Sequence, residues 1–152
     1  MHKINIYSIV KPSSDEFDKL SKEFIKMCSK YAKVEVYSIF NKNISKAQTI
    51  GEKEAKESYT KVYEPYLSGF NIALDVLGTK VDSFEFSNII TNHSEINFFI
   101  GGAFGFEKEF LKKCNKTISL SSITMAHKVV TLVLLEQVFR GLSIRHNHPY
   151  HK

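Results

Sequence analysis

The sequence predicts an α/β fold in which a mainly parallel sheet carries helices on both faces. Five stretches of strand character alternate with five of helical character along the 152 residues. Parallel neighbours need a crossover connection, usually a helix, so this alternation is typical of a parallel sheet. No linker, repeat or low-complexity segment interrupts the pattern. We therefore expect a single domain over residues 1–152.

The first three elements follow from periodicity. HKINIYSIV alternates apolar and polar residues, which predicts a strand at 2–10. Ser13 stands three residues before Glu16, as in a capping box, and apolar residues then recur at helical spacing. This pattern predicts an amphipathic helix at 14–31. KVEVYSIF, rich in β-branched and aromatic residues, predicts a second strand at 33–40.

The middle of the chain starts with a polar, lysine-rich segment at 41–66. We expect a loop and then an exposed helix from Ala47 to Tyr63, weakened early by Gly51 and stopped by Pro65. FNIALDVLG is a short apolar run that ends in glycine. It predicts a buried strand at 70–78.

The last elements have shorter signals. Ser83 is expected to cap a helix at about 84–92, and INFFIGG predicts a buried strand. GAFGF then turns the chain into a helix at about 106–114, and KTISLSS predicts the fifth strand. Residues 126–141 form the most apolar helix. Its apolar residues surround most of its circumference, which in a small domain indicates an interface with a second subunit.

The composition is that of an ordinary globular domain, with 43% hydrophobic and 24% charged residues. No run approaches the roughly 20 apolar residues of a membrane helix. The N-terminus has no cleavable signal pattern, so we expect a cytoplasmic protein without a membrane partner. Cys28 and Cys114 lie far apart outside any CxxC motif, and both are expected to be reduced packing residues.

The net charge of +5 is concentrated in the C-terminal third. Residues 106–152 hold 8 basic and 3 acidic residues, whereas residues 1–105 hold 13 of each. A positive segment of this kind suits an anionic partner such as RNA. The alternative is a basic face that is simply solvated.

The glycine turn FFIGGAFGF is the first candidate site. Gly101, Gly102 and Gly105 follow a buried strand and precede a helix, where the backbone can approach a ligand closely. The spacing is GGxxG instead of GxGxxG, it follows a late strand, and no acid stands about 20 residues on, so a dinucleotide site is disfavoured. The alternative is a tight turn without a ligand.

The loop LSSITMAH is the second candidate. Ser121, Ser122 and Thr124 are able to cap the following helix. The same loop offers backbone groups of the kind that commonly hold an adenine. His127 stands at the start of that helix, where packing or capping is the more common role.

The C-terminal tail HNHPYHK raises a separate question. It holds His146, His148 and His151, which suggests a metal clip, a basic hook for nucleic acid or one wall of an active site. No cysteine or carboxylate ligand lies near these histidines in sequence, and their spacing matches no helical metal pair, so we predict no metal site. Arg140 either pairs with Glu136 at i, i+4 or faces an anion.

Together these motifs resemble one family. ALD, FFIGGAFG, LSSITMAH, LLEQVFR and the terminal NHPYHK occur in the order and spacing of the RlmH family, which are ribosomal large-subunit pseudouridine methyltransferases of the SPOUT class. The resemblance covers the whole chain. It implies a SPOUT-type α/β fold with a C-terminal trefoil knot and a homodimer. It also implies S-adenosylmethionine as cofactor and methylation of N3 of a pseudouridine in helix 69 of 23S ribosomal RNA on the assembled ribosome.

The resemblance also implies where the site residues fall. The donor would be held by residues from three segments: Leu74, Gly101, and the loop residues Leu120, Ser121, Ser122, Ile123, Thr124 and Met125. The tail would close the site and supply the catalytic group: Tyr150 to stack on the base, His151 to bind its edge or assist loss of the N3 proton, and Arg140 to hold a phosphate or carbonyl.

Two positions depart from the family pattern. Thr131 stands where the family usually has an arginine, and Ala126 stands where it has a proline. Two alternatives therefore remain: a ribosome-binding module of the same fold that has lost catalysis, and a non-catalytic α/β dimer with a solvated basic face.

Overall fold

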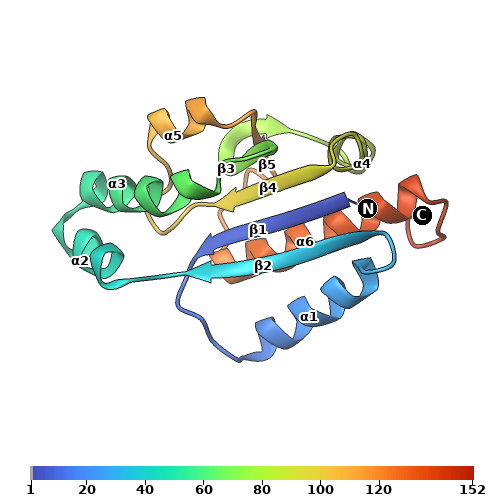
Figure 1. Ribbon diagram of the computed structural model, residues 1–152, viewed down its shortest axis with the longest axis horizontal. Helices are drawn as coiled ribbons and strands as arrows, with labels where there is room; N and C mark the ends of the chain where they lie inside the picture. Colours follow the sequence, from blue (N-terminus) through green and yellow to red (C-terminus); the bar gives the residue numbers. More distant parts are fainter. Residues whose placement is uncertain (1) are drawn as a thin grey trace.

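The computed structural model describes residues 2–152 and has the α/β fold that the sequence predicts. Its strands form a single sheet in the order β2-β1-β4-β3-β5, and every pairing is parallel (Figure 1). The carboxyl ends of β1, β2 and β4 therefore lie at one edge of the sheet, which the part of β3 before its bulge also approaches. The strands are β1 His2–Ile9, β2 Ala32–Ile39, β3 Phe70–Lys80, β4 Glu95–Ile100 and β5 Lys116–Ser119.

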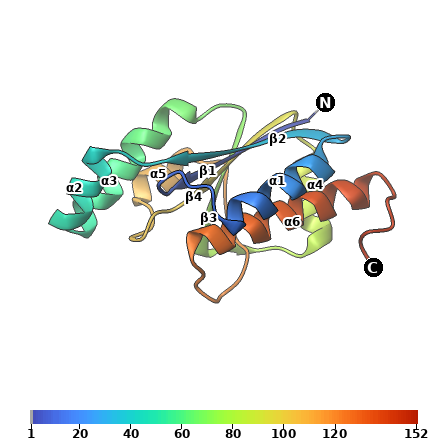
Figure 2. The same ribbon diagram turned by 90° about the horizontal axis from the view of Figure 1, so that it is seen from below.

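Helices cover both faces of the sheet (Figures 1 and 2). One face carries α1, α4 and α6, with α6 packed against both of the others, and the other face carries α2, α3 and α5. The helices are α1 Glu16–Cys28, α2 Lys42–Ile50, α3 Glu52–Tyr63, α4 Ser83–Thr91, α5 Lys108–Lys113 and α6 His127–Arg145, with a 3-10 turn at Glu64–Tyr66.

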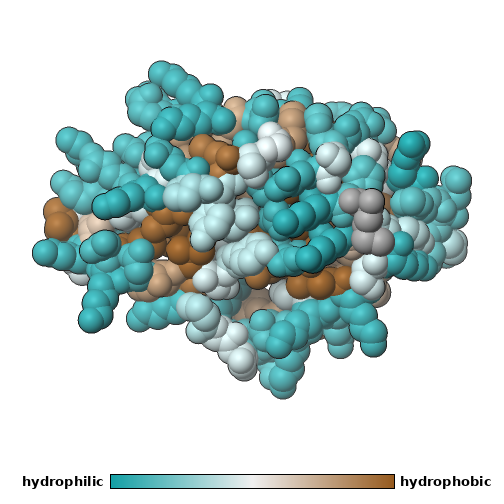
Figure 3. Space-filling view, in the orientation of Figure 1, coloured by the Kyte–Doolittle hydropathy of each residue, from teal (hydrophilic) through white to brown (hydrophobic). Residues whose placement is uncertain are grey.

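Two apolar cores result from the alternation of side chains along the strands. In β1, Ile4 and Ile6 face the core beneath α1, α4 and α6, whereas Tyr7 and Ile9 face the core beneath α2, α3 and α5. Figure 3 shows that hydrophilic side chains dominate the visible surface, with hydrophobic patches between them. Within residues 2–152, no helix combines the length and hydropathy needed to cross a membrane.

A row of buried asparagines crosses the sheet. Asn5, Asn97 and Asn71 are paired in register on β1, β4 and β3. The Asn5 side-chain amide donates to the Asn97 oxygen at 2.9 Å, and the Asn97 amide donates to the Asn71 oxygen at 3.2 Å. Asn115 continues the row, since its side chain accepts from the Asn71 backbone N–H at 2.8 Å. Side-chain hydrogen bonds therefore link the three central strands inside the sheet, although the Asn5 side-chain oxygen at the end of the row has no partner among the described residues.

The pairing of β3 with β5 is interrupted at the carboxyl edge. Leu74 and Thr79 both pair with Ile118, so residues 75–78 bulge out of the ladder. Leu77, within the bulge, is 92% exposed. The predicted strand at 70–78 is thus correct in place, but the strand resumes after the bulge and ends at Lys80.

Two predicted helix caps are wrong by one or two residues. Asp15, and not Ser13, caps α1, because its carboxylate accepts from the Asp18 N–H at 3.1 Å. Asp82, and not Ser83, caps α4, because it accepts from the Glu85 N–H at 2.8 Å. A carboxylate also interacts favourably with the positive end of the helix dipole, unlike the serine hydroxyl beside it.

The segment after β2 is helical earlier than predicted. The expected loop at 41–46 is instead the start of α2, which Asn41 caps by accepting from the Ile44 N–H at 2.8 Å. Gly51 then separates α2 from α3 with an extended backbone. The Ile44 side chain is fully buried under the sheet, so tertiary packing stabilises a turn that local propensity does not favour.

Helix α6 is longer than predicted and ends in a reversal. It continues to Arg145, and Asn147 then takes up a left-handed conformation with φ of 56°. The His148 N–H donates to the Ser143 carbonyl at 2.9 Å, which closes the end of the helix. The remaining tail therefore returns along α6.

The Tyr63 hydroxyl offers a test of this packing. It is fully buried and donates toward the carbonyls of Ile100, at 2.6 Å, and Tyr7, at 3.1 Å. Burial also raises the pKa of Tyr63 well above its usual range, so the proton remains available for these bonds. We expect Tyr63→Phe to lower the free energy of unfolding by about 1–3 kcal/mol, because a buried acceptor loses its donor.

Urea denaturation measures this loss, with Tyr66→Phe as the matched control. Tyr66 also stacks on Tyr7 but is 43% exposed, so its change should be close to neutral. Equal stability of the two variants would contradict the role assigned to the buried hydroxyl.

Candidate active site

A cavity of about 540 Å³ opens at the carboxyl edge of the sheet. It lies between the end of β3, the glycine turn after β4 and the loop before α6. All but one of the residues predicted to hold the donor line it: Leu74, Gly101, Leu120, Ser121, Ile123, Thr124 and Met125. Ser122 is exposed and is not part of this wall. The structure thus joins three segments that are far apart in sequence.

The glycine turn shapes one wall of the cavity. The Gly105 N–H donates to the Gly102 carbonyl at 3.1 Å, and Gly105 has a φ of +83°, which favours glycine. A Cβ at Gly102 would lie 2.4 Å from the ring of Tyr59. A Cβ at Gly101 would lie 3.2 Å from Phe106 and 3.3 Å from Gly105, both of which line the cavity. Steric constraints therefore favour glycine at each of these three positions.

The serine-threonine loop has a different role from the predicted cap. Among the residues that the structure describes, no side chain caps the N-terminus of α6. Ser121 instead organises the loop itself, because its hydroxyl accepts from the Ile123 N–H at 3.0 Å and its carbonyl accepts from the Ser119 hydroxyl at 2.9 Å. Ile123 remains 73% exposed at the mouth of the cavity.

Sequence reasoning missed part of the wall. Val76 and Leu77 enter it from the bulge of β3, and Phe104 and Phe106 enter it from the turn. The aromatic residues of the GAFGF turn could have been predicted to line the site, whereas no sequence pattern predicts the bulge. His127 also lines the cavity, and its pKa is lowered by burial and then by the neighbouring Lys128. A neutral imidazole is therefore favoured there.

The first turn of α6 separates this cavity from a smaller one of about 180 Å³. His127 and Val130 face the larger cavity, whereas Lys128 and Thr131 face the smaller. Thr131, one of the two departures from the family pattern, is 7% exposed and donates to the His127 carbonyl at 3.0 Å. This departure does not alter the donor cavity, whereas Ala126, the other departure, is part of its wall.

Lys128 joins the start of α6 to the loop before α1. Its ammonium group pairs with the Asp15 carboxylate and donates to the Ser13 hydroxyl at 3.0 Å. The hydrogen bond from Lys128 lowers the pKa of Asp15. The cation is thereby paired within the protomer.

The predicted catalytic residues form a cluster at the other end of α6. The Glu136 carboxylate accepts from the Arg140 Nη2 at 2.5 Å and from the Tyr150 hydroxyl at 3.1 Å. The Arg140 guanidinium also lies 4.9 Å from the centre of the Tyr150 ring. Hydrogen bonding to Glu136 raises the pKa of Arg140, and burial followed by this carboxylate raises the pKa of Tyr150. Of the two predicted alternatives for Arg140, the structure has the ion pair with Glu136.

The three tail histidines have three different partners. His146 stacks on Tyr31 at 4.4 Å, His148 accepts from the Tyr150 N–H at 3.3 Å, and His151 contacts the Arg140 Nη1 at 3.1 Å. Across residues 2–152, no three His, Cys, Asp or Glu side chains are grouped to hold a metal ion. Cys28 and Cys114 are both unpaired thiols, and burial raises their pKa values to about 12 and about 11.

The tail and the donor cavity do not meet within one chain. His127 and Arg140 are separated along α6 by about 20 Å, at 1.5 Å per residue. In Figure 1 the C-terminus lies at the end of the molecule opposite the arrowheads of β1, β2 and β4. The two groups of predicted site residues are therefore both formed but spatially separate.

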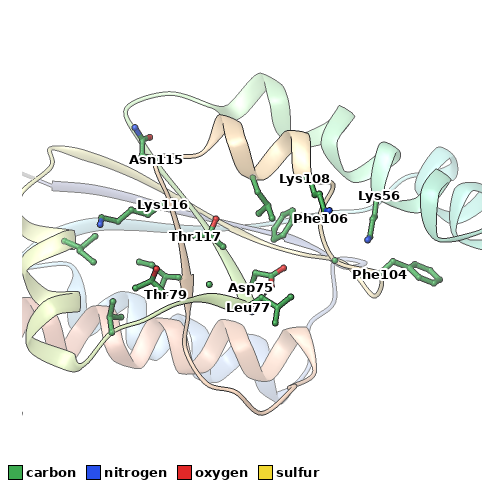
Figure 4. A pocket seen from close by; sticks show the side chains of 16 residues that line it. Lys56, Asp75, Leu77, Thr79, Phe104, Phe106, Lys108, Asn115, Lys116 and Thr117 are labelled. Atoms are coloured by element: carbon green, nitrogen blue, oxygen red, sulfur yellow. Dashed lines mark hydrogen bonds between the residues drawn. The ribbon is translucent and has the colours of Figure 1, made fainter.

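A further cavity of about 720 Å³ adjoins the donor cavity across the β3 bulge (Figure 4). The two share Asp75 and Leu77 from the bulge and residues 104–106 from the turn. Figure 4 shows Lys56 and Lys108 on the side of Phe106, with Lys116 farther along the cavity. The surroundings of the donor cavity are thus more basic on this side.

Comparison with known proteins identifies the family. A model described as predicted SPOUT methyltransferase matches residues 2–151. A protein named ribosomal RNA large subunit methyltransferase H from Aliarcobacter butzleri (strain RM4018) is 66% identical over 150 residues, covering 99% of each chain. A protein of the same name from Sulfurovum sp. (strain NBC37-1) is 50% identical over 152 residues, again covering 99% of each.

Among solved structures, the TrmH/SpoU tRNA modifying enzyme of A. aeolicus aligns with a TM-score of 0.50 and 17% identity, over 96% of this chain and 78% of that chain. This likeness concerns the fold alone. The full-length sequence matches and the cavity at the carboxyl edge agree, and the chain belongs to the SPOUT methyltransferase family.

Proposed function

We propose that this chain uses S-adenosylmethionine to methylate large-subunit ribosomal RNA, at N3 of a pseudouridine in helix 69 of 23S RNA on the assembled ribosome. The observation that supports this most is the convergence of the predicted donor residues on one cavity. The relatives at 66% and 50% identity are both named as methyltransferases of large-subunit ribosomal RNA. The proposed substrate implies that the reaction takes place in the cytoplasm.

The cavity fits the proposed donor in size and chemistry. Its volume of about 540 Å³ lies in the range of small-molecule sites, and its walls are mainly apolar or backbone. Leu74, Gly101 and the loop at 120–125 would hold the adenosyl part. Within this loop, Ser122 has the least support, because it does not line the cavity. S-adenosylmethionine supplies an electrophilic methyl group on a sulfonium centre. The chain would contribute alignment of the acceptor nitrogen and exclusion of water.

We further propose that the active form is a homodimer whose C-terminal half carries the family's trefoil knot. Apolar residues on the helical face support the dimer: Phe17 and Leu20 on α1 are 38% and 46% exposed, and Leu132 and Val133 on α6 are only partly buried. Because a tail cannot reach the cavity of its own chain, the partner's tail would close each site. Arg140, Tyr150 and His151 would then meet the acceptor base across the interface.

Donor binding is the first expected outcome. S-adenosylhomocysteine at 100 times its dissociation constant should stabilise the fold by about 2.7 kcal/mol, seen as a rise in melting temperature. Gly101→Val should abolish this rise, because its side chain would enter the wall formed by Phe106 and Gly105.

Gly51→Val is the matched control for this substitution. Gly51 lies between α2 and α3, and a Cβ there would contact only the Glu54 carboxylate at 3.2 Å. The control should keep the ligand-induced rise. If wild type shows no rise in a large excess of the ligand, the donor site proposal fails.

Methyl transfer tests the substrate. Labelled methyl from S-adenosylmethionine should enter assembled ribosomes that lack the modification, and not free ribosomal RNA. Label in neither, with donor binding intact, would contradict the proposed substrate and point to the Thr131 departure or to a different RNA target.

Subunit mixing tests the shared site. Deletion of Pro149–Lys152 and Gly101→Val should each abolish transfer while leaving the dimer intact. Mixing the two inactive proteins so that their subunits exchange should restore about a quarter of wild-type activity. Half of the dimers are then mixed, and each mixed two-fold dimer holds one complete site out of two. No recovery, with mixed dimers verified, would mean that the tail acts on its own chain or is not part of the site.

A further inference from the structure

The Glu136 carboxylate is the central acceptor of the tail cluster. Its Oε1 accepts from the Arg140 Nε at 3.0 Å, the Arg140 Nη2 at 2.5 Å and the Tyr150 hydroxyl at 3.1 Å. Its Oε2 accepts from the Gln137 amide at 2.8 Å. The side chains of Glu136 and Arg140 are only 23% and 25% exposed, so this charged pair is largely shielded from water.

Helix α4 supports the cluster at two points. The Ser83 hydroxyl donates to the Gln137 side-chain oxygen at 3.1 Å, which orients the Gln137 amide toward Glu136. The Phe84 and His151 rings meet edge to face, with centroids 5.0 Å apart and planes at 87°. Phe139 meets the Tyr150 ring in the same manner at 4.7 Å. The tail side chains are therefore held by fixed elements on both sides.

The Arg140 contact determines the protonation pattern of the His151 ring. A guanidinium group has donors and no acceptor, so the His151 Nδ1, 3.1 Å from the Arg140 Nη1, must accept. An accepting Nδ1 carries no proton. The neutral ring then has its proton on Nε2, the nitrogen opposite the arginine, and can only donate from that position.

We propose that Glu136 is a positioning residue which, through Arg140, presents His151 as a hydrogen-bond donor from Nε2 to a carbonyl oxygen of the acceptor base. The inference rests on the proposed function and refines it. Two carbonyl groups flank N3 of a pseudouridine, and a donor to either stabilises the negative charge that develops as N3 loses its proton. His151 keeps its own proton, and the N3 proton leaves to solvent.

This assignment excludes a base role for His151 in the arrangement described. A general base needs an unprotonated nitrogen within reach of the substrate. The only unprotonated nitrogen of this ring is held by Arg140. The Tyr150 hydroxyl is likewise engaged with Glu136, which leaves its ring as the group available to a base.

Nitrogen-15 NMR of histidine-labelled protein tests the arrangement without substrate. At about pH 8, where imidazoles are ordinarily neutral, long-range proton–nitrogen spectra distinguish the two tautomers. The signal lost in His151→Gln identifies the residue. We expect one Nε2–H form in wild type and in the control Arg145→Gln, and a mixture of tautomers in Glu136→Gln and Arg140→Gln. A dominant Nδ1–H form in wild type would overturn the proposal.

Methyl transfer to ribosomes tests the role of the donor. His151→Gln places an amide N–H on a side chain of similar reach and should retain clearly more activity than His151→Ala. Equal loss in both, or no loss in His151→Ala, would overturn the donor role. Glu136→Gln should lower kcat on the order of 10- to 100-fold by misplacing the tail, while keeping the thermal response to S-adenosylhomocysteine.

The two proposals fail in distinguishable ways. If wild type binds no donor or transfers no methyl, the proposed function fails, whereas the tautomer spectra still decide whether Glu136 and Arg140 position His151. Glu52→Gln is the matched control for Glu136→Gln, because Glu52 pairs with Lys56 at 2.9 Å on a different helix at i, i+4. A loss of activity in this control equal to that of Glu136→Gln would overturn the specific role of Glu136.

Discussion

The rigid length of α6 is the constraint on which the arrangement of the proposed site depends. Its first turn lines the donor cavity, whereas Glu136 lies at its middle and Arg140 one turn farther on. The helix rises by about 20 Å between His127 and Arg140, so it holds the two groups apart at a fixed distance. The helix packs against both α1 and α4, which fixes the direction of both ends. The proposal that each tail closes the site of the partner subunit follows from this separation.

The parallel sheet supplies the other half of the geometry. Because every strand runs in the same direction, the ends of β3, β4 and β5 deliver their loops to one edge. The loops themselves are shaped by small local effects: a bulge in β3, a positive φ at Gly105 and the hydrogen bond from the Ile123 N–H to the Ser121 hydroxyl. The cavity is thus formed by three irregular segments that a regular sheet positions, as is common for binding sites in α/β proteins.

Much of this was predictable from sequence because the signals are local. The strand periods, the glycine turn and the loop at 120–127 are contiguous patterns, and the family resemblance joined them into one donor site. The caps at Asp15 and Asp82 were missed because a serine with a similar signal stands nearby in each case. The bulge of β3 depends on its partner strand β5, some forty residues later, and no local pattern specifies it.

The tail illustrates a different limit. The sequence indicated that Arg140, Tyr150 and His151 act together, and the structure does bring them together. What it does not bring together is that cluster and the donor cavity. Their separation follows from the extent of α6 and from the left-handed turn at Asn147, which are tertiary properties. The link between Glu136 and the tail was hidden for the same reason, since its hydrogen bond with Tyr150 forms only once the tail has folded back.

The asparagine row has a consequence for how the chain finds its fold. Its members lie at positions 5, 71, 97 and 115, so every bond in it joins segments that are distant in sequence. Apolar strands are chemically alike and tolerate many alignments, whereas a buried amide needs a hydrogen-bonding partner at a defined position. Sliding any one strand by a residue would place an amide against isoleucine or phenylalanine. The row thus specifies both the neighbour and the register of each central strand.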